Sequence, residues 1–315
     1  MTVELSVIIP VYNEEDSLSA LYERLVAVLP GVAASFEILF VDDGSQDRSW
    51  PLIQALGDRD RGVRGIRFSR NFGHQTAITA GLENARGRVV VIMDADLQDP
   101  PELIPEMMAK HHEGYEVVYA VRAARAGESW FKRGSAGLFY RLLGSITQVD
   151  IPVDTGDFRL MGPLAVSAFR RLPERHRFTR GLVAWLGFRQ VGVPFDRAAR
   201  FAGRSKYPLR RMLRLASDGI FSFSHLPLQV ATVLGVAVSL LGLAYIAVVV
   251  ALAISGTAPT GHAVLLAAIL LLGGAQLLAV GLLGEYLGRV FDEVKGRPLF
   301  LVQETVGDEL EKPSR

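Results

Sequence analysis

The sequence predicts an α/β fold built around a mostly parallel sheet, and three observations carry that prediction. Short apolar segments alternate with segments of helical periodicity as far as residue 121. Three of the apolar segments end in acidic or turn-forming clusters, which suits the carboxyl edge of a sheet, where open α/β folds bind ligands. An almost uncharged region begins near residue 226, so the globular part is expected to end before it.

The elements follow in order along the first part of the chain. Apolar segments rich in β-branched residues predict strands at Leu5–Val11, Glu37–Val41, Arg64–Phe68, Val89–Met93 and Val117–Val121. Helical patterns separate them at Ser17–Leu29, from Ser49 onward, at Thr76–Ala85 and at Glu102–His112. Because strand and helix alternate, we expect helices on both faces of the sheet.

Bulk properties and missing motifs exclude some classes. The 315 residues suffice for one large domain or two smaller ones, and the net charge of +1 favours no particular partner. The chain has no cysteine, so it has no disulfide and no thiolate metal site. No Gly-x-Gly-x-x-Gly follows the first strand, and no phosphate-binding Gly-Lys-Ser/Thr loop occurs, which disfavours dehydrogenases and P-loop nucleotidases. No signal peptide and no nucleic-acid partner are indicated.

Two segments have the composition of amphipathic helices. Residues 130–146 and 207–225 mix basic residues with aromatic or aliphatic ones. Such helices often lie in a membrane interface, and a solvated surface helix is the alternative.

Two uncharged stretches predict a transmembrane hairpin within residues 226–288. Residues 227–254 and 262–284 are each long enough to cross a hydrocarbon layer of ~30 Å at ~1.5 Å per residue. Their connecting loop, Ser255–Gly261, has no Lys or Arg, whereas both outer flanks are basic, so the positive-inside rule places residues 1–206 and the tail 289–315 in the cytoplasm. A buried helical hairpin is the alternative. Gly284 and Gly288 form one small-xxx-small pair, which permits an oligomer.

The strand expected at Val89–Met93 runs directly into Asp94, Asp96 and Gln98. Oxygen ligands two residues apart can share one Mg²⁺ or Mn²⁺ and leave other positions for phosphate oxygens. The sequence therefore predicts a metal-bound nucleotide diphosphate at this turn. Acidic or turn residues also follow the first two strands, at Pro10–Glu14 and Asp42–Ser45, and on one sheet edge the three clusters would form a single cleft.

An ordered set of motifs resembles the family 2 glycosyltransferases of the GT-A fold, in the branch of dolichyl-phosphate mannose synthase and the bacterial polyprenyl-phosphate glucosyltransferases. The resemblance covers nearly the whole chain. Its motifs are Pro10–Glu14, Val41–Ser45, Arg70–Gln75, Met93–Pro100, Asp154–Leu160, Arg177–Gly181, Arg200–Tyr207 and Gly284–Pro298. The fold class is then a GT-A, Rossmann-like α/β domain with interfacial amphipathic helices and a C-terminal two-helix transmembrane hairpin.

The resemblance implies roles for residues on the donor side. Nucleotide-sugar binding falls to Pro10, Tyr12, Glu14, Asp42, Asp43, Asp94, Ala95 and Asp96. Asp94, Asp96 and Gln98 would hold Mg²⁺ or Mn²⁺. We expect Asp99 to be a turn residue before two prolines and His74 to be structural or supporting.

On the acceptor side, cationic groups must compensate the negative charge of the lipid phosphate and diphosphate. Arg122 follows the fifth expected strand and could face the cleft, and Arg200 and Lys206 could form a mobile flap that closes on phosphate. The resemblance assigns residues around Arg133 and Ser135 to the lipid phosphate, with contact to anionic lipids as the alternative for Arg133.

The resemblance makes Asp157 the catalytic base, and Asp154 is expected to be structural. A phosphate monoester has a second pKa near ~6 and is mostly dianionic at pH 7, so it needs little deprotonation. We therefore hypothesise that Asp157 positions the acceptor or the sugar at least as much as it removes a proton.

The expected reaction transfers a hexose from a nucleotide diphosphate sugar to polyprenyl (undecaprenyl) phosphate at the cytoplasmic face of the inner membrane, with inversion. UDP-glucose is favoured as the donor, ahead of GDP-mannose and modified UDP-pentoses. The alternatives are a processive polysaccharide synthase, disfavoured because no Gln-x-x-Arg-Trp motif occurs, and a non-catalytic lipid-binding membrane scaffold.

Overall fold

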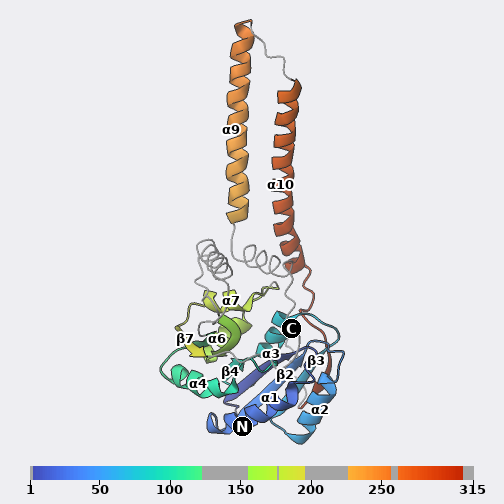
Figure 1. The fold of residues 1–315 in the computed structure, drawn as a ribbon, viewed down its shortest axis with the longest axis vertical. Coiled ribbons are helices and arrows are strands. Elements are labelled where there is room, and N and C mark those ends of the chain that lie inside the picture. The colour runs from blue at the N-terminus through green and yellow to red at the C-terminus, as the bar shows by residue number, and fades with distance from the viewer. Residues whose placement is uncertain (1–2, 123–154, 176, 196–225, 257–261, 308–315) are drawn as a thin grey trace, which may run out of the picture. The chain divides into compact units, whose positions relative to one another are not determined.

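The structure is a computed structural model that describes residues 3–122, 155–175, 177–195, 226–256 and 262–307 (Figure 1). Contacts divide the chain into two units. The first comprises Met1–Met212 and Pro298–Arg315, and the second comprises Leu213–Arg297. Each unit is treated by itself. The predicted amphipathic helices at 130–146 and 207–225 lie outside the described residues.

The first unit contains one eight-stranded sheet in the order β7-β5-β6-β4-β1-β2-β3-β8. Its centre is parallel: β1 pairs with β2 on one side and β4 on the other, and β2 pairs with β3. These strands are β1 (Leu5–Val11), β2 (Phe36–Asp42), β3 (Val63–Phe68) and β4 (Val89–Ile92). All residues of β1 and β4 are buried, because helices cover both sides of the sheet.

Two strands of the first unit run antiparallel to their neighbours. β6 (Thr155–Met161) lies between β4 and β5 (Val117–Arg122) and is antiparallel to both, and β5 pairs in parallel with β7 (Gln190–Phe195). At the opposite edge, β8 (Val302–Val306) pairs antiparallel with β3. The C-terminal segment therefore completes the sheet of the N-terminal unit.

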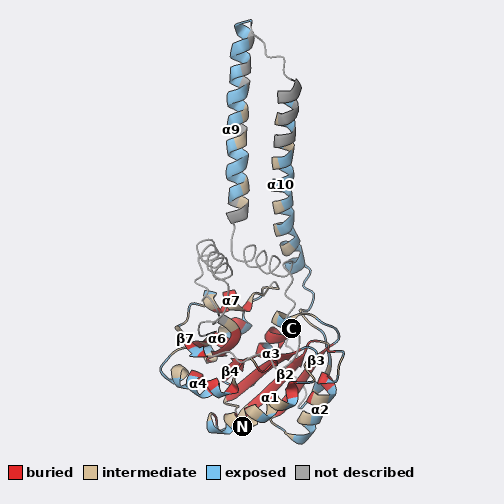
Figure 2. Cartoon of the chain, viewed as in Figure 1, coloured by how far each residue is buried: buried red, intermediate tan, exposed pale blue. Residues whose placement is uncertain are grey.

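Helices form a layer on each face of the sheet (Figure 2). Apolar residues of α1 (Leu18–Val28), α2 (Ser49–Arg59) and α4 (Ile104–His112) share one buried cluster with Leu5, Val7 and Ile9 of β1. Ile8 faces the other way, against α3 (His74–Asn84). There Gly81 allows close packing, since a Cβ at this position would lie 2.2 Å from the Ile8 Cγ2 atom.

The remaining helices of this unit are α6 (Pro163–Arg170) and α7 (Thr179–Trp185). Short 3-10 turns occupy Leu29–Gly31 and Pro101–Leu103. The Arg170 guanidinium fastens α6 to the end of α3 by donating to the carbonyls of Leu82 (2.7 Å) and Ala85.

The expected α/β fold with a mostly parallel sheet is confirmed, and each of the five predicted strands is present within one residue at either end. Strands β6, β7 and β8 and helices α6 and α7 were not anticipated. β8 lies in a segment that we expected to be a simple tail, because its five residues, VQETV, alternate without a strong apolar pattern.

The second unit consists of α9 (Leu226–Ile254) and α10 (His262–Val294), which pack side by side and run antiparallel (Figure 1). Within the described residues, one helix is long and apolar enough to cross a membrane, at Val230–Leu252 of α9. The predicted second span is not confirmed by this criterion. α10 extends ten residues beyond the predicted end at 284 and carries an ion pair, Glu285–Arg289, in that extension.

Candidate active site

The three strand-end clusters lie at one edge of the sheet. β4, β1 and β2 are adjacent and parallel, so the residues that follow them emerge on the same side. β6 adds Asp157 beside them, because Ile92 of β4 pairs with Arg159 of β6. The predicted cleft residues of the three clusters are thus brought together with the predicted catalytic residue.

The end of β1 presents one aromatic ring to solvent. Tyr12 is 44% exposed, whereas Pro10 is buried within β1 opposite Val41. Glu14 is half-buried, and its carboxylate accepts a hydrogen bond from the Ser17 hydroxyl at 2.9 Å. An exposed ring beside a carboxylate could stack on a nucleotide base while the carboxylate accepts N–H or hydroxyl donors.

Asp42 and Asp43 end β2 as two buried carboxylates. Asp42 Oδ1 accepts from the Ser45 amide at 3.2 Å, and its Oδ2 lies 3.4 Å from Arg67 Nε. Asp43 accepts from the amides of Phe72 (2.6 Å) and Gly73 (2.9 Å), directly before α3. Burial raises the pKa of both carboxyls, and these hydrogen bonds partly offset that effect. Asp43 therefore ties the end of β2 to the start of α3.

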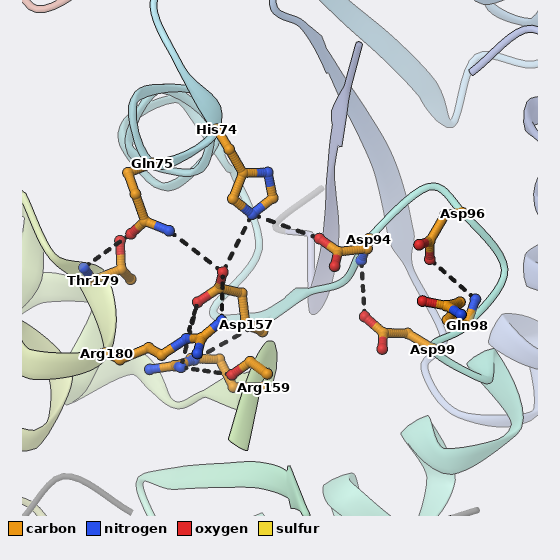
Figure 3. Close-up of polar contacts among 11 residues, drawn as sticks. His74, Gln75, Asp94, Asp96, Gln98, Asp99, Asp157, Arg159, Thr179 and Arg180 are labelled. Carbon is orange, nitrogen blue, oxygen red and sulfur yellow. Dashed lines mark hydrogen bonds and ion pairs between the residues drawn. The ribbon is translucent and has the colours of Figure 1, made fainter. Parts of the chain in front are cut away.

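The turn after β4 is held by its own side chains (Figure 3). Asp99 Oδ2 accepts from the Asp94 amide at 3.0 Å, and Asp96 Oδ1 accepts from the Gln98 amide at 3.1 Å. Leu97 adopts a left-handed conformation, with φ 60°, and its side chain is buried. Ala95 is buried as well. Asp99 is thus a turn-forming residue, as the sequence indicated.

Asp157 lies at the centre of a cationic cluster (Figure 3). Its carboxylate accepts from Arg180 Nε at 2.9 Å and from Gln75 Nε2 at 3.3 Å, and His74 Nε2 lies 3.3 Å from Oδ2. Burial opposes ionisation of Asp157, but the charge of Arg180 and the hydrogen bond from His74 outweigh it, so the pKa lies well below its usual value. The buried guanidinium of Arg159 is 3.8 Å away.

His74 connects the two acidic positions. Its Nε2 atom lies 3.6 Å from Asp94 Oδ1 as well as 3.3 Å from Asp157. Partial burial lowers the pKa of His74, yet the hydrogen bond that its ring donates to Asp157 and the charges of Asp94 and Asp157 raise it to about 9. Partial burial and the charges of Asp157 and Asp96 raise the pKa of the half-buried Asp94, whereas His74 lowers it. A protonated His74 therefore balances the charge of both carboxylates.

The predicted metal ligands fit a divalent cation that also takes ligands from its substrate. Asp94 turns toward His74 and is 36% exposed, while Asp96 is tied to the Gln98 amide (Figure 3). Within the described part of the chain, no group of three His, Cys, Asp or Glu side chains is placed to hold a metal. Mg²⁺ characteristically uses one or two carboxylates plus phosphate oxygens and water, so a sparse protein ligand set suits it.

The predicted phosphate-binding residues lie mostly outside the described chain. This applies to Arg133, Ser135, Arg200 and Lys206. Arg122 is the last residue of β5, and its side chain is not described.

Sequence reasoning assigned no role to Arg180 or Gln75, although both occur within quoted motifs. Gln75 donates to Asp157 and also accepts from the Thr179 amide at 3.0 Å, which joins α3 to α7. His74, which we expected to be supporting, contacts both acidic positions directly.

Comparison with known proteins identifies the family of the chain. Residues 6–165 match the family model described as glycosyl transferase family 2. An uncharacterized glycosyltransferase of Bacillus subtilis (strain 168), YkcC, is 49% identical, over 98% of this chain and 95% of the relative. The SfII prophage-derived bactoprenol glucosyl transferase of Shigella flexneri is 38% identical, over 96% of this chain and 98% of the relative.

Among solved structures, the glucosyl-3-phosphoglycerate synthase of Mycobacterium tuberculosis, in complex with Mn²⁺, UDP and glucosyl-3-phosphoglycerate, is similar with a TM-score of 0.47. It is 18% identical and covers 70% of this chain and 78% of that chain. On the sequence matches, the protein is a glycosyltransferase. It belongs to glycosyl transferase family 2, which confirms the resemblance that the motifs indicated.

Proposed function

We propose that this protein transfers glucose from UDP-glucose to polyprenyl phosphate at the cytoplasmic face of a membrane. The observation that carries the proposal is the bridge formed by His74, which brings the acidic turn after β4 and the Asp157 cluster into one site. A relative matched over nearly its full length is named a bactoprenol glucosyl transferase, which supports a polyprenyl phosphate acceptor and glucose as the sugar.

The donor would lie along the edge formed by β1, β2 and β4. In this proposal Tyr12 stacks on the base, while Glu14 and Asp43 accept hydrogen bonds from the nucleoside. Asp42, whose carboxylate faces the Ser45 amide and the Arg67 guanidinium, would support Asp43 in this proposal. Asp94, Asp96 and Gln98 would hold a divalent cation, which as a Lewis acid stabilises the leaving diphosphate.

The reaction itself would be an in-line displacement. An oxygen of the lipid phosphate forms a bond to the anomeric carbon as the bond from that carbon to the diphosphate breaks, and UDP departs with the electron pair. The configuration at the anomeric carbon inverts. Because two anions must meet, the protein has to supply positive charge and alignment more than a base.

Arg180 and Asp157 suit that requirement. The Asp157 carboxylate is ionised and already engaged by Arg180 and His74, so it is a poor acceptor for another proton. We propose that it orients these two cations toward the reacting groups. Arg122, Arg133, Ser135, Arg200 and Lys206 remain the proposed contacts of the lipid phosphate and diphosphate.

The proposal is tested with purified protein in detergent, radiolabelled UDP-glucose and undecaprenyl phosphate. We expect a labelled lipid product that requires Mg²⁺ or Mn²⁺ and is lost with EDTA. Parallel reactions with GDP-mannose and UDP-pentoses test the sugar. Product formed at full rate without a divalent metal would overturn the roles given to Asp94, Asp96 and Gln98, and no product with any donor would favour the non-catalytic lipid-binding scaffold.

A matched pair of variants tests the metal site without measuring catalysis. We expect Asp94→Asn to weaken Mn²⁺ binding in the presence of UDP by at least about tenfold, since a carboxylate ligand becomes a weaker neutral one. Asp58→Asn, in α2, serves as the control for loss of one negative charge. Equal Mn²⁺ affinity in the two variants, measured by electron paramagnetic resonance, would contradict the assignment of Asp94.

A further inference from the structure

Strand β8 follows the apolar helices in the sequence but belongs to the catalytic unit. One residue of the strand, Glu304, makes specific contacts with that unit. Its Oε2 atom accepts from the Trp50 indole N–H at 2.8 Å, and its Oε1 atom accepts from Arg67 Nη1 at 3.0 Å. Trp50 is almost fully buried, so Glu304 is fixed to the core of the unit rather than only to its surface.

Glu304 is the outer member of a charged row across three neighbouring strands. Asp42 of β2 pairs in register with Arg67 of β3, and Arg67 pairs with Glu304 of β8. Cross-strand partners on one face of a sheet lie close enough for their side chains to interact. The row therefore alternates in sign, and Arg67 bridges Glu304 at 3.0 Å and Asp42 at 3.4 Å.

Asp42 depends on this row for charge compensation. Its side chain is fully buried, and Oδ2 accepts no hydrogen bond from any described residue, so the Arg67 charge is what balances it. Removing the partner of a buried charge is costly. The Arg67 guanidinium must therefore stay in place. Among the described residues, Glu304 pairs with it, and the Trp50 ring lies 5.8 Å from its Cζ atom.

Asp42 in turn begins the tight turn that carries Asp43. The Ser45 amide donates back to Asp42, and Gly44 between them has φ 72°, in the left-handed region. A Cβ on Gly44 would lie 2.6 Å from the Arg70 carbonyl carbon, so the turn is closely packed against the segment before α3. A shift of Asp42 would therefore move Asp43, the proposed nucleoside contact.

We propose that Glu304 and Arg67 are positioning residues for the nucleotide site, so that the C-terminal strand sets the affinity for the donor through Asp42. The inference rests on the proposed function only in that the Asp42–Ser45 turn binds a nucleoside diphosphate. If β8 were only a structural edge strand, a substitution in it would instead lower the stability of the protein, or would raise the KM for both substrates equally.

Glu304→Gln is the central test. Glutamine keeps the size of the side chain and an oxygen that can accept from Trp50, but it removes the charge that holds Arg67. The control is Thr305→Val on the same strand, at an exposed position next in sequence and on the opposite face. Binding of UDP with Mn²⁺ is measured by titration calorimetry on the full-length protein in detergent, together with steady-state kinetics and the melting temperature.

We expect Glu304→Gln to raise the Kd for UDP and the KM for the nucleotide sugar about fivefold, the scale of losing one partner of a partly exposed ion pair. The kcat, the KM for the lipid phosphate and the melting temperature should stay near those of the unaltered protein. In an Arg67→Gln background, provided it folds, Glu304→Gln should have no further effect on the Kd, because the coupling runs through Arg67.

Unchanged UDP affinity in Glu304→Gln would overturn the inference, and so would an equal loss in Thr305→Val. A parallel rise in KM for both substrates, with a lowered melting temperature, would also overturn it. Protein that binds UDP but transfers no sugar to polyprenyl phosphate would refute the proposed function while this inference stands. Absence of UDP binding by the unaltered protein would overturn both.

Discussion

At the residue scale, the charges of the site are balanced by a small number of side chains that contact one another. Asp157 engages Arg180, His74 and Gln75 at once, and His74 also reaches Asp94. A carboxylate with these partners is ionised throughout the neutral range, because its pKa lies well below the usual value. In the proposed function, the contribution of Asp157 to the rate therefore comes from its position and its electric field rather than from uptake of a proton.

Asp157→Asn tests this conclusion directly. We expect kcat to fall about a hundredfold or more, since Arg180 and His74 lose the group that orients them. The loss should be nearly uniform from about pH 6 to 8, because a carboxyl with a lowered pKa does not titrate there. The KM for the lipid phosphate should also rise.

The pH–rate profile and the acceptor KM decide the outcome. A variant that lost only a basic limb near neutral pH, with unchanged affinity for the acceptor, would make Asp157 a general base. Gln190→Ala offers a control in the same unit, because the Gln190 side chain donates to the Val183 carbonyl rather than to a residue of the Asp157 cluster.

At the element scale, α3 links the sheet to the site. Its first residues, His74 and Gln75, contact Asp157, and its middle packs against Ile8 of β1 through Gly81. The amides of Phe72 and Gly73, directly before the helix, donate to Asp43, and the N-terminus of a helix favours negative charge. Close packing at Gly81 therefore helps to hold the start of the helix in its place.

Gly81→Ala should destabilise the catalytic unit by about 1–3 kcal/mol, because the new Cβ would overlap the Ile8 side chain. This corresponds to a decrease in the melting temperature of about 3–10 °C in detergent. Because alanine favours the helix more than glycine does, a decrease in the melting temperature can be attributed to the packing overlap.

The matched control is Gly31→Ala. Nothing lies within 4 Å of a Cβ at Gly31, so the melting temperature should barely change. A stabilised Gly81→Ala variant would mean that α3 packs less tightly on β1 than the structure indicates.

At the scale of the whole molecule, the chain leaves the catalytic unit for α9 and α10 and returns to it as β8. The positive-inside pattern predicts that the chain enters the membrane from the cytoplasmic side before α9 and returns to that side after α10. α9 meets the length and composition expected of a span. The second crossing remains a prediction, and the membership of β8 in the catalytic unit supports it because β8 must be on the same side as β3.

The absence of cysteine in the chain allows a direct topology test. We expect a single Ala258→Cys variant, at a position between α9 and α10 in the sequence, to react with a membrane-impermeant maleimide in intact cells. A single Gln303→Cys variant, on β8, should react only after the cells are permeabilised. The unaltered chain gives the background, and labelling of both variants from outside would contradict a two-span topology.

The sequence alone was sufficient for the parallel centre of the sheet and for the positions of its acidic clusters. β1 and β4 are buried on both faces, so the sequence of each is a nearly continuous apolar run. Neighbouring parallel strands end at the same edge of the sheet. Asp94 and Asp96 could therefore be singled out without a structure, whereas Asp157 was identified only through the motif Asp154–Leu160 that carries the family resemblance. Family membership followed from the same motifs.

Only the tertiary structure decided which groups meet at that edge. The antiparallel β6 places Asp157 next to β4, and α7 brings Arg180 to it from 23 residues away in the sequence. Glu304 reaches Arg67 across 237 residues. Such contacts leave no periodic signal in a short window, because they depend on how distant elements pack rather than on local preference. The chemical type of each residue is thus given by the sequence, whereas the ion pairs that shift its pKa and fix its position arise from the fold.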